Sequence, residues 1–160
     1  MTRRSLKENK KFNGIWFFGL AGAGKTFATL IGISYKEKPF IIDGDAVRKY
    51  ISFDLGHSSS DRDIQLKRVL SLAKIAVINQ QIPVVSKVII LKKVLLRCSQ
   101  LSFKIKQIIR PIEKLNVVRG ISETQINIVG KDIQQKDFGV VKIHNNGDQN
   151  FVKVVENFVG

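Results

Sequence analysis

The chain has 160 residues, of which 44% are hydrophobic, so it is long enough to bury one core and too short for two domains of ordinary size. No apolar run reaches the roughly 18 residues that a membrane-spanning helix needs, and residues 1–10 lack the apolar centre of a signal peptide. The sequence therefore predicts a cytoplasmic protein without a membrane partner. One cysteine, Cys98, and two histidines far apart, His57 and His144, argue against a disulfide framework and a zinc-type ligand cluster.

Basic residues outnumber acidic ones by 27 to 13, which gives a net charge of +14 and predicts an anionic partner such as a nucleotide, a nucleic acid or an anionic lipid. The excess is dispersed apart from an N-terminal arm, residues 1–13, and the pair Lys92-Lys93. We interpret it as a solvated surface plus a loose arm, and we do not expect a nucleic-acid partner.

The first predicted elements surround a glycine-rich turn. Residues 14–18 are an apolar run typical of a buried strand, and residues 25–35 are compatible with a helix. The turn between them matches G-x-x-x-x-G-K-S/T at every position. Because such a loop wraps phosphates in backbone amides, it predicts an ATP site with Lys25 at the β- and γ-phosphates and Thr26 on Mg²⁺. The predicted ATP-binding residues are Gly19, Leu20, Ala21, Gly22, Ala23, Gly24, Lys25 and Thr26. The alternative is a glycine-rich turn that binds no phosphate.

Acidic residues follow the second predicted strand, 39–42, and precede a predicted helix, 46–52. A carboxylate at this point can accept the proton of a substrate hydroxyl or hold a metal ion, so Asp43 and Asp45 join Lys25 as candidate catalytic residues, and Asp43 joins Thr26 as a candidate metal ligand. The structural alternative is an acidic N-cap for the helix. Arg48 lies three residues after Asp45 on the same helical face and is a candidate clamp for an anionic acceptor.

The rest of the chain continues to alternate. Ser60-x-x-Asp63 resembles a capping box before a long predicted helix, 64–78, and Arg62 and Arg68 frame the start of that helix. Further strands are predicted at 83–90, 103–109 and 140–143, and helices at 91–101, 112–119 and 151–158. This alternation predicts a three-layer α/β/α P-loop nucleoside-triphosphate-hydrolase fold with a mainly parallel five-stranded sheet, formed as one domain by residues 14–160. Ligands of such folds lie at the carboxyl ends of the strands.

Together, the P-loop, Asp43-Gly-Asp-Ala-Val-Arg48, Asp54-Leu-Gly-His-Ser58 and Asp61-Arg62 with Arg68 resemble the adenylylsulfate kinase family over residues 14–85. The resemblance implies a phosphotransferase of sulfate assimilation that uses ATP and Mg²⁺ to phosphorylate the ribose 3′-hydroxyl of adenosine 5′-phosphosulfate. It also implies an acceptor site, an ATP-side role for Arg119 and a short lid near 119–132, and it leaves a homodimer open. The acceptor-side residues that it implies are Arg48, His57, Arg62, Gln65 and Arg68.

Several positions depart from the family pattern. His57 stands where the family has Phe in D-L-G-F-S, and Gln65 where it has Asn in D-R-x-x-N-I-R-R. Phe27 replaces a second hydroxyl residue after the P-loop, and the family's F-I-S-P-Y-R appears as Val88-Ile-Ile-Leu-Lys-Lys93, without its aromatic and its serine. The short motifs Asn127-Ile-Val-Gly-Lys-Asp132 and Asn145-Asn146-Gly147 look more like a divergent branch associated with surface-polysaccharide synthesis, which includes cytidine diphosphoramidate kinase.

The sequence therefore leaves the acceptor open between adenosine 5′-phosphosulfate and a cytidine diphosphoramidate-type nucleotide. Two other classes stay open as well. One is a non-catalytic ATP-binding homologue, suggested by Phe27, the short lid and the missing segment. The other is a nucleic-acid-linked ATPase or polynucleotide kinase, suggested by the net charge alone, whose binding would weaken steeply with salt.

Overall fold

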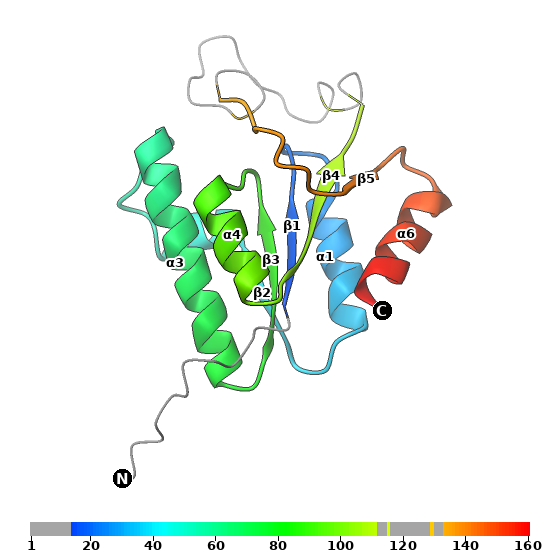
Figure 1. The fold of residues 1–160 in the computed structure, drawn as a ribbon, viewed down its shortest axis with the longest axis horizontal. Helices are drawn as coiled ribbons and strands as arrows, with labels where there is room; N and C mark the ends of the chain where they lie inside the picture. Colours follow the sequence, from blue (N-terminus) through cyan, green and yellow to red (C-terminus); the bar gives the residue numbers. More distant parts are fainter. Residues whose placement is uncertain (1–13, 112–114, 116–128, 130–132) are drawn as a thin grey trace.

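The computed structural model describes residues 14–111, 115, 129 and 133–160. Strands and helices alternate along these residues (Figure 1). The elements are β1 (Ile15–Phe18), α1 (Lys25–Ser34), β2 (Pro39–Asp43), α2 (Gly44–Tyr50), α3 (Ser59–Ile78), β3 (Ile82–Lys87), α4 (Lys92–Gln100), β4 (Lys104–Ile109), β5 (Lys142–His144) and α6 (Gln149–Val159).

The strands form one five-stranded sheet in the order β2-β3-β1-β4-β5, and every neighbouring pair is parallel. The predicted fold is therefore confirmed. β1 lies at the centre, between β3 and β4, so the loop that follows it emerges at the middle of the carboxyl edge. This is the position at which open α/β sheets bind their ligands.

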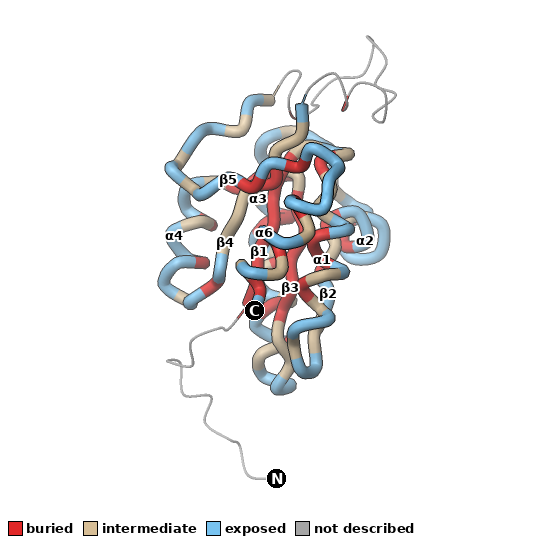
Figure 2. The backbone as a smooth tube through the Cα atoms, turned by 90° about the vertical axis from the view of Figure 1, so that its right-hand side faces the viewer, coloured by how far each residue is buried: buried red, intermediate tan, exposed pale blue. Residues whose placement is uncertain are grey.

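Helices cover both faces of the sheet, with α3 and α4 on one side and α1 and α6 on the other (Figure 1). Side chains alternate along β1, so Trp16 and Phe18 join the core under α3 and α4, while Ile15 and Phe17 join the core under α1 and α6. All four residues of β1 are buried, and burial is concentrated along the central strands (Figure 2). A strand buried on both faces is apolar at every position, which is why the apolar run in the sequence predicted β1.

The predicted capping box is wrong by two residues. Ser58, not Ser60, is the N-cap of α3: its hydroxyl accepts a hydrogen bond from the backbone N–H of Asp61 at 3.2 Å and donates to Asp61 Oδ2 at 2.7 Å. Ser58-x-x-Asp61 offers the same spacing of hydroxyl and carboxylate as the predicted pair, and the helix begins at this earlier pair. The carboxylate of Asp63 is used differently, in ion pairs with Lys67 and Lys93.

The third strand ends at Lys87, three residues before the predicted end at 90. Ile89 and Ile90 are buried although they lie outside the sheet, and the Ile90 N–H donates to Gln135 Oε1 at 2.8 Å. The apolar run continues past the strand because the residues that leave the sheet stay in the core.

Three predicted segments lie mostly or wholly outside the described residues: the arm 1–13, the helix 112–119 apart from Leu115, and the lid 119–132 apart from Val129. Among the helices that the structure describes, none combines the length and the apolar character that crossing a membrane requires.

Candidate active site

The glycine-rich loop, residues 19–24, joins β1 to α1 and packs tightly against the neighbouring strands. The Gly19 N–H donates to the carbonyl of Lys87, the last residue of β3, at 3.1 Å. On the other side, a side-chain carbon at Gly19 would lie 2.2 Å from the Ile108 carbonyl oxygen of β4. Only glycine fits this approach, so the first glycine of the motif holds the loop in the sheet.

The loop delivers Lys25 and Thr26 to the first turn of α1. Gly24 is the N-cap in a left-handed conformation, with φ of 104°, and Lys25 is the first residue of the helix. The Lys25 ammonium folds back and donates to the Leu20 carbonyl at 2.8 Å, and Thr26 is exposed. A cation and a hydroxyl therefore stand at the mouth of the loop, and their contacts with a phosphate and a metal ion stay predictions.

Asn145 braces the glycine-rich loop from the far end of the sequence. Its Nδ2 donates to the Ala23 carbonyl at 2.8 Å, and its Oδ1 accepts from the Gly147 N–H at 2.9 Å. Arg110, just after β4, donates to the Gly22 carbonyl at 3.1 Å. From the sequence, Asn145 was identified only as part of a family motif, and this role was not predicted. The available signal was the run Asn145-Asn146-Gly147 shortly after a predicted strand.

Asp43 ends β2 and caps α2. Its Oδ2 accepts hydrogen bonds from the backbone N–H groups of Asp45 at 3.1 Å and Ala46 at 3.0 Å. Asp43 is therefore an acidic N-cap, which is the alternative role that the sequence left open. Both bonds fall on one oxygen, which leaves Oδ1 of the same carboxylate for another ligand. Asp45 is exposed at the same edge of the sheet.

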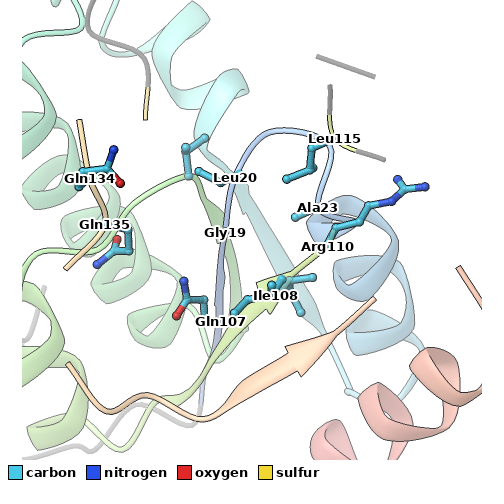
Figure 3. A pocket seen from close by; sticks show the side chains of 11 residues that line it. Gly19, Leu20, Ala23, Gln107, Ile108, Arg110, Leu115, Gln134 and Gln135 are labelled. Atoms are coloured by element: carbon cyan, nitrogen blue, oxygen red, sulfur yellow. The ribbon is translucent and has the colours of Figure 1, made fainter. Parts of the chain in front are cut away.

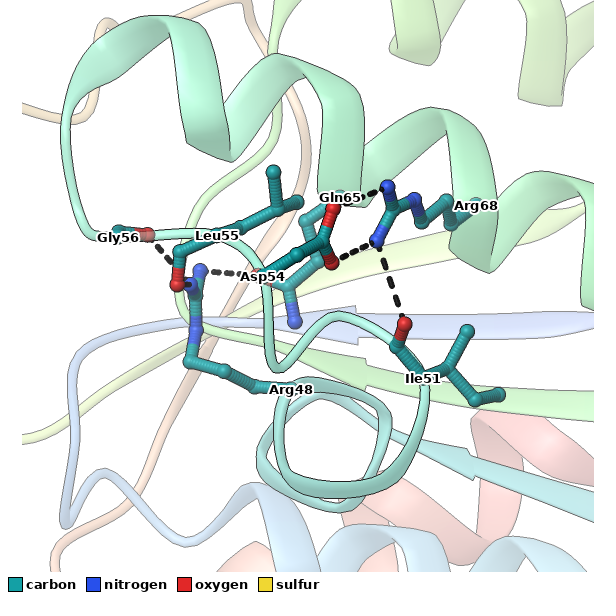
Figure 4. A network of polar contacts seen from close by, with 7 residues as sticks. All are labelled: Arg48, Ile51, Asp54, Leu55, Gly56, Gln65 and Arg68. Carbon is teal, nitrogen blue, oxygen red and sulfur yellow. Dashed lines mark hydrogen bonds and ion pairs between the residues drawn. The ribbon is translucent and has the colours of Figure 1, made fainter.

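Arg48 and Gln65 connect α2, α3 and the loop between them (Figure 4). Arg48 Nη1 donates to the carbonyls of Leu55 at 3.4 Å and Gly56 at 2.5 Å, and Nη2 donates to Gln65 Oε1. Gln65 is fully buried and donates from Nε2 to the Gly44 carbonyl at 2.9 Å. Both predicted acceptor residues thus lie together, and both position the start of α2 and the loop 51–58.

Arg68 forms a separate contact with the same loop. It makes a two-pronged ion pair with Asp54, at 2.5 and 2.8 Å, and donates to the Ile51 carbonyl at 3.2 Å (Figure 4). The guanidinium lowers the pKa of Asp54 through these hydrogen bonds; Asp54 is exposed and Arg68 is half-buried. In this arrangement Arg68 holds the loop, and its predicted contact with an acceptor stays a prediction.

A group of cations lies between Arg48 and the end of β3. Arg62 is 9% exposed, and its Nε donates to the His57 carbonyl at 3.1 Å. Burial, followed by the charges of Arg48 and Arg62, lowers the pKa of His57. Lys87 belongs to the same group, and it could not be recognised from the sequence because it stands inside a largely apolar run.

A cavity of about 210 Å³ opens beside the glycine-rich loop (Figure 3). Its wall is mainly apolar, and Gln107, Gln134 and Gln135 supply amide groups. Arg119, the remaining predicted ATP-side residue, lies outside the described residues.

The fold and the loop define a class: an α/β protein of the P-loop type, with a phosphate cradle at the carboxyl edge of a parallel sheet. A family model described as adenylylsulphate kinase matches residues 11–102. This match covers more than half of the chain, so the protein belongs to the adenylylsulfate kinase family.

Relatives named adenylyl-sulfate kinase agree with this assignment over about half of the chain. An adenylyl-sulfate kinase of Halothermothrix orenii is 39% identical over 82 residues, 49% of this chain and 44% of the relative. One of Marinobacter nauticus is 38% identical over 78 residues, 46% of this chain and 39% of the relative. The chain thus matches less than half of the length of these relatives.

The likeness in fold extends further than the likeness in sequence. The structure of the Mycobacterium tuberculosis APS kinase in complex with AMPPNP and APS covers 91% of this chain and 96% of its own, with a TM-score of 0.75 and 17% identity. A sugar kinase from Janibacter superposes with a TM-score of 0.61 and 12% identity. At these identities the superpositions establish the fold alone.

Proposed function

We propose that this protein is an ATP-dependent kinase that transfers the γ-phosphate to the ribose 3′-hydroxyl of a nucleotide, with adenosine 5′-phosphosulfate as the first candidate acceptor. The observation that carries the proposal is the glycine-rich loop, which is held rigidly between β3, β4 and Asn145 with Lys25 at its mouth. Family membership supports the choice of acceptor.

On the donor side, Gly19 to Thr26 would hold the ATP phosphates through backbone amides, and Lys25 would leave the Leu20 carbonyl to contact the β- and γ-phosphates. Mg²⁺ fits the same edge, because the Thr26 hydroxyl and Asp43 Oδ1 are the hard oxygen ligands that this ion takes together with phosphates and water. Bound there, the ion would neutralise charge on the phosphates. Arg119 would add an ATP-side contact from the predicted lid.

On the acceptor side, Arg48, His57, Arg62, Gln65 and Arg68 would surround the nucleotide whose hydroxyl reacts. The attacking 3′-oxygen forms a bond to the γ-phosphorus, the bond to the β,γ-bridging oxygen breaks, and ADP leaves with that electron pair. Asp43 or Asp45 accepts the hydroxyl proton. Preformed hydrogen bonds from Arg48 to the loop 51–58 would keep the acceptor wall in place while the phosphate moves.

The first experiment is an ADP-release assay with MgATP and a panel of acceptors: adenosine 5′-phosphosulfate, cytidine diphosphoramidate, and ordinary nucleoside mono- and diphosphates. We expect turnover with adenosine 5′-phosphosulfate. Turnover with the cytidine compound alone would assign the protein to the divergent branch, and MgATP binding without turnover on any acceptor would indicate a non-catalytic homologue.

Lys25→Ala should abolish turnover while the fold persists, because the ammonium supplies charge at the phosphates and donates to the Leu20 carbonyl of the loop. Lys153→Ala, an exposed lysine on α6, is the charge-matched control and should retain wild-type turnover. Circular dichroism of each variant checks the fold. A Lys25→Ala protein that turns over at the wild-type rate would remove the basis for the ATP site.

We further propose that the reaction takes place in the cytoplasm, where ATP is available. A homodimer stays a prediction that size-exclusion chromatography with light scattering would test. A hexameric APS kinase is known from Thiobacillus denitrificans and shares the fold, with a TM-score of 0.61.

A further inference from the structure

Lys87, the last residue of β3, is a buried lysine at the carboxyl edge of the sheet. It is 6% exposed and stands opposite Phe18, the residue that precedes the glycine-rich loop. A side-chain carbon at Gly44 would lie 2.7 Å from Lys87 Cδ and 3.0 Å from Nζ, so the side chain runs over Gly44 at the start of α2. The ammonium therefore lies between the loop that would hold ATP and the wall that would hold the acceptor.

Charged groups surround this ammonium from three elements. Arg48 of α2 and Arg62 of α3 repel it, and Asp45 and Asp43 attract it. The net environment disfavours the charge: burial first, then Arg48 and Arg62, lower the pKa of Lys87 to about 8. His57, in the loop before α3, feels Lys87 as a further positive charge.

The other members of the group have protein partners, whereas the Lys87 ammonium has none among the residues that the structure describes. Arg48 donates to carbonyls of the loop 51–58, Arg62 donates to the His57 carbonyl, and one oxygen of Asp43 caps α2. Within the described part of the chain, no hydrogen bond or ion pair holds the Lys87 ammonium. Burial of the side chain and the charges of Arg48 and Arg62 disfavour the ammonium, and an anion placed beside it would offset that penalty.

We propose that Lys87 binds a phosphoryl oxygen of the acceptor nucleotide and is thus an additional acceptor-binding residue of this site. The face of the sheet on which the Lys87 side chain lies decides whether Lys87 contacts ATP or the acceptor nucleotide. Lys87 lies two positions after Val85 on β3, so both side chains point to the same face of the sheet, and Val85 packs under α3. Helix α1, which follows the glycine-rich loop, covers the opposite face (Figure 1). Lys25 supplies the cation on the ATP side, and Lys87 supplies one on the side of Arg48 and Arg62.

The inference rests on the proposed function, because it assigns the anion to an acceptor nucleotide. The test compares wild type, Lys87→Met and Lys74→Met by isothermal titration of the full chain. Methionine keeps the length of the lysine stem without its charge, and Lys74 is an exposed lysine on α3 that serves as the charge-matched control. The titrants are MgATP, and adenosine 5′-phosphosulfate and cytidine 5′-diphosphate added to the MgADP-loaded protein.

We expect Lys87→Met to weaken binding of the acceptor probe tenfold to a hundredfold, the usual range for loss of a hydrogen bond to a charged group, and to change MgATP binding by less than twofold. Lys74→Met should match wild type for all titrants. Equal acceptor affinity in wild type and Lys87→Met overturns the inference, and so does a loss confined to MgATP, which would place Lys87 on the donor.

Failure of the inference is distinguishable from failure of the proposed function. Wild-type protein that binds MgATP but neither acceptor probe overturns the role of Lys87 and leaves the ATP site intact. Wild-type protein that binds no nucleotide at all overturns both.

Discussion

Replacing Lys87 by methionine should stabilise the unliganded protein and change how its stability depends on pH. Burial and the charges of Arg48 and Arg62 lower the pKa of Lys87 from 10.5 to about 8. Below pH 8 both the folded protein and the unfolded chain carry the proton, and the folded protein bears the unfavourable charge. Between pH 8 and 10.5 the unfolded chain binds more protons than the folded protein, so the free energy of unfolding rises with pH.

The difference between the two pKa values corresponds to about 3 kcal/mol in the free energy of unfolding. Lys87→Met removes this term at every pH. The stability advantage of the variant over wild type should therefore be largest near pH 7 and should shrink by about 3 kcal/mol on going to pH 10.5.

The assay is equilibrium urea unfolding at half-unit steps from pH 7 to 10.5, followed by the fluorescence of Trp16, the only tryptophan, which is fully buried. All other ionisable groups are shared by both proteins, so their contributions cancel in the difference. Lys74→Met should run parallel to wild type. Parallel curves for wild type and Lys87→Met would refute the argument that Lys87 is a buried, uncompensated cation.

Three further predictions concern packing around the site. Asn145→Ala leaves the Ala23 carbonyl without its donor, so urea unfolding should show a loss of about 1–3 kcal/mol, and titration should show weaker MgATP binding. Gly19→Ala would bring a carbon to 2.2 Å from the Ile108 carbonyl oxygen; we expect a lower melting temperature and no MgATP binding, and unchanged values would contradict the described packing. Burial raises the pKa of Cys98 to about 12, so an aromatic disulfide reagent should label it slowly in native protein and at once in urea.

The donor half of the site could be predicted from the sequence because it is contiguous. Residues 19–26 carry the loop, the cation and the hydroxyl within eight positions, and the flanking strand and helix follow from local apolar patterns. The residues that support the loop could not be predicted in this way. Asn145 contacts Ala23 across 122 positions of sequence, and no spacing rule connects the two.

The acceptor half was predicted only as a set of residues, and their contacts depend on tertiary structure. Arg48 and Gln65 are 17 positions apart, and their hydrogen bond forms because α2 and α3 pack against each other. Lys87 escaped notice for a different reason. A single lysine in a strand usually has a solvated head, and here the sheet edge, Gly44 and α3 enclose it.

Helix α2 connects the two halves of the site. Its first residues donate to Asp43 Oδ2, which fixes the carboxylate at the donor side, and Arg48 in its last turn holds the loop at the acceptor side. The capping role of Asp43 and its proposed role toward Mg²⁺ or the hydroxyl proton are therefore compatible, because the cap uses one oxygen and orients the other. A helix of seven residues, Gly44–Tyr50, that is anchored at both ends leaves little freedom between Asp43 and Arg48. An acceptor nucleotide whose anionic group lies between Arg48, Arg62 and Lys87 would thus have its hydroxyl aligned with the carboxylate that accepts the hydroxyl proton. The backbone of one short helix, α2, would set this alignment.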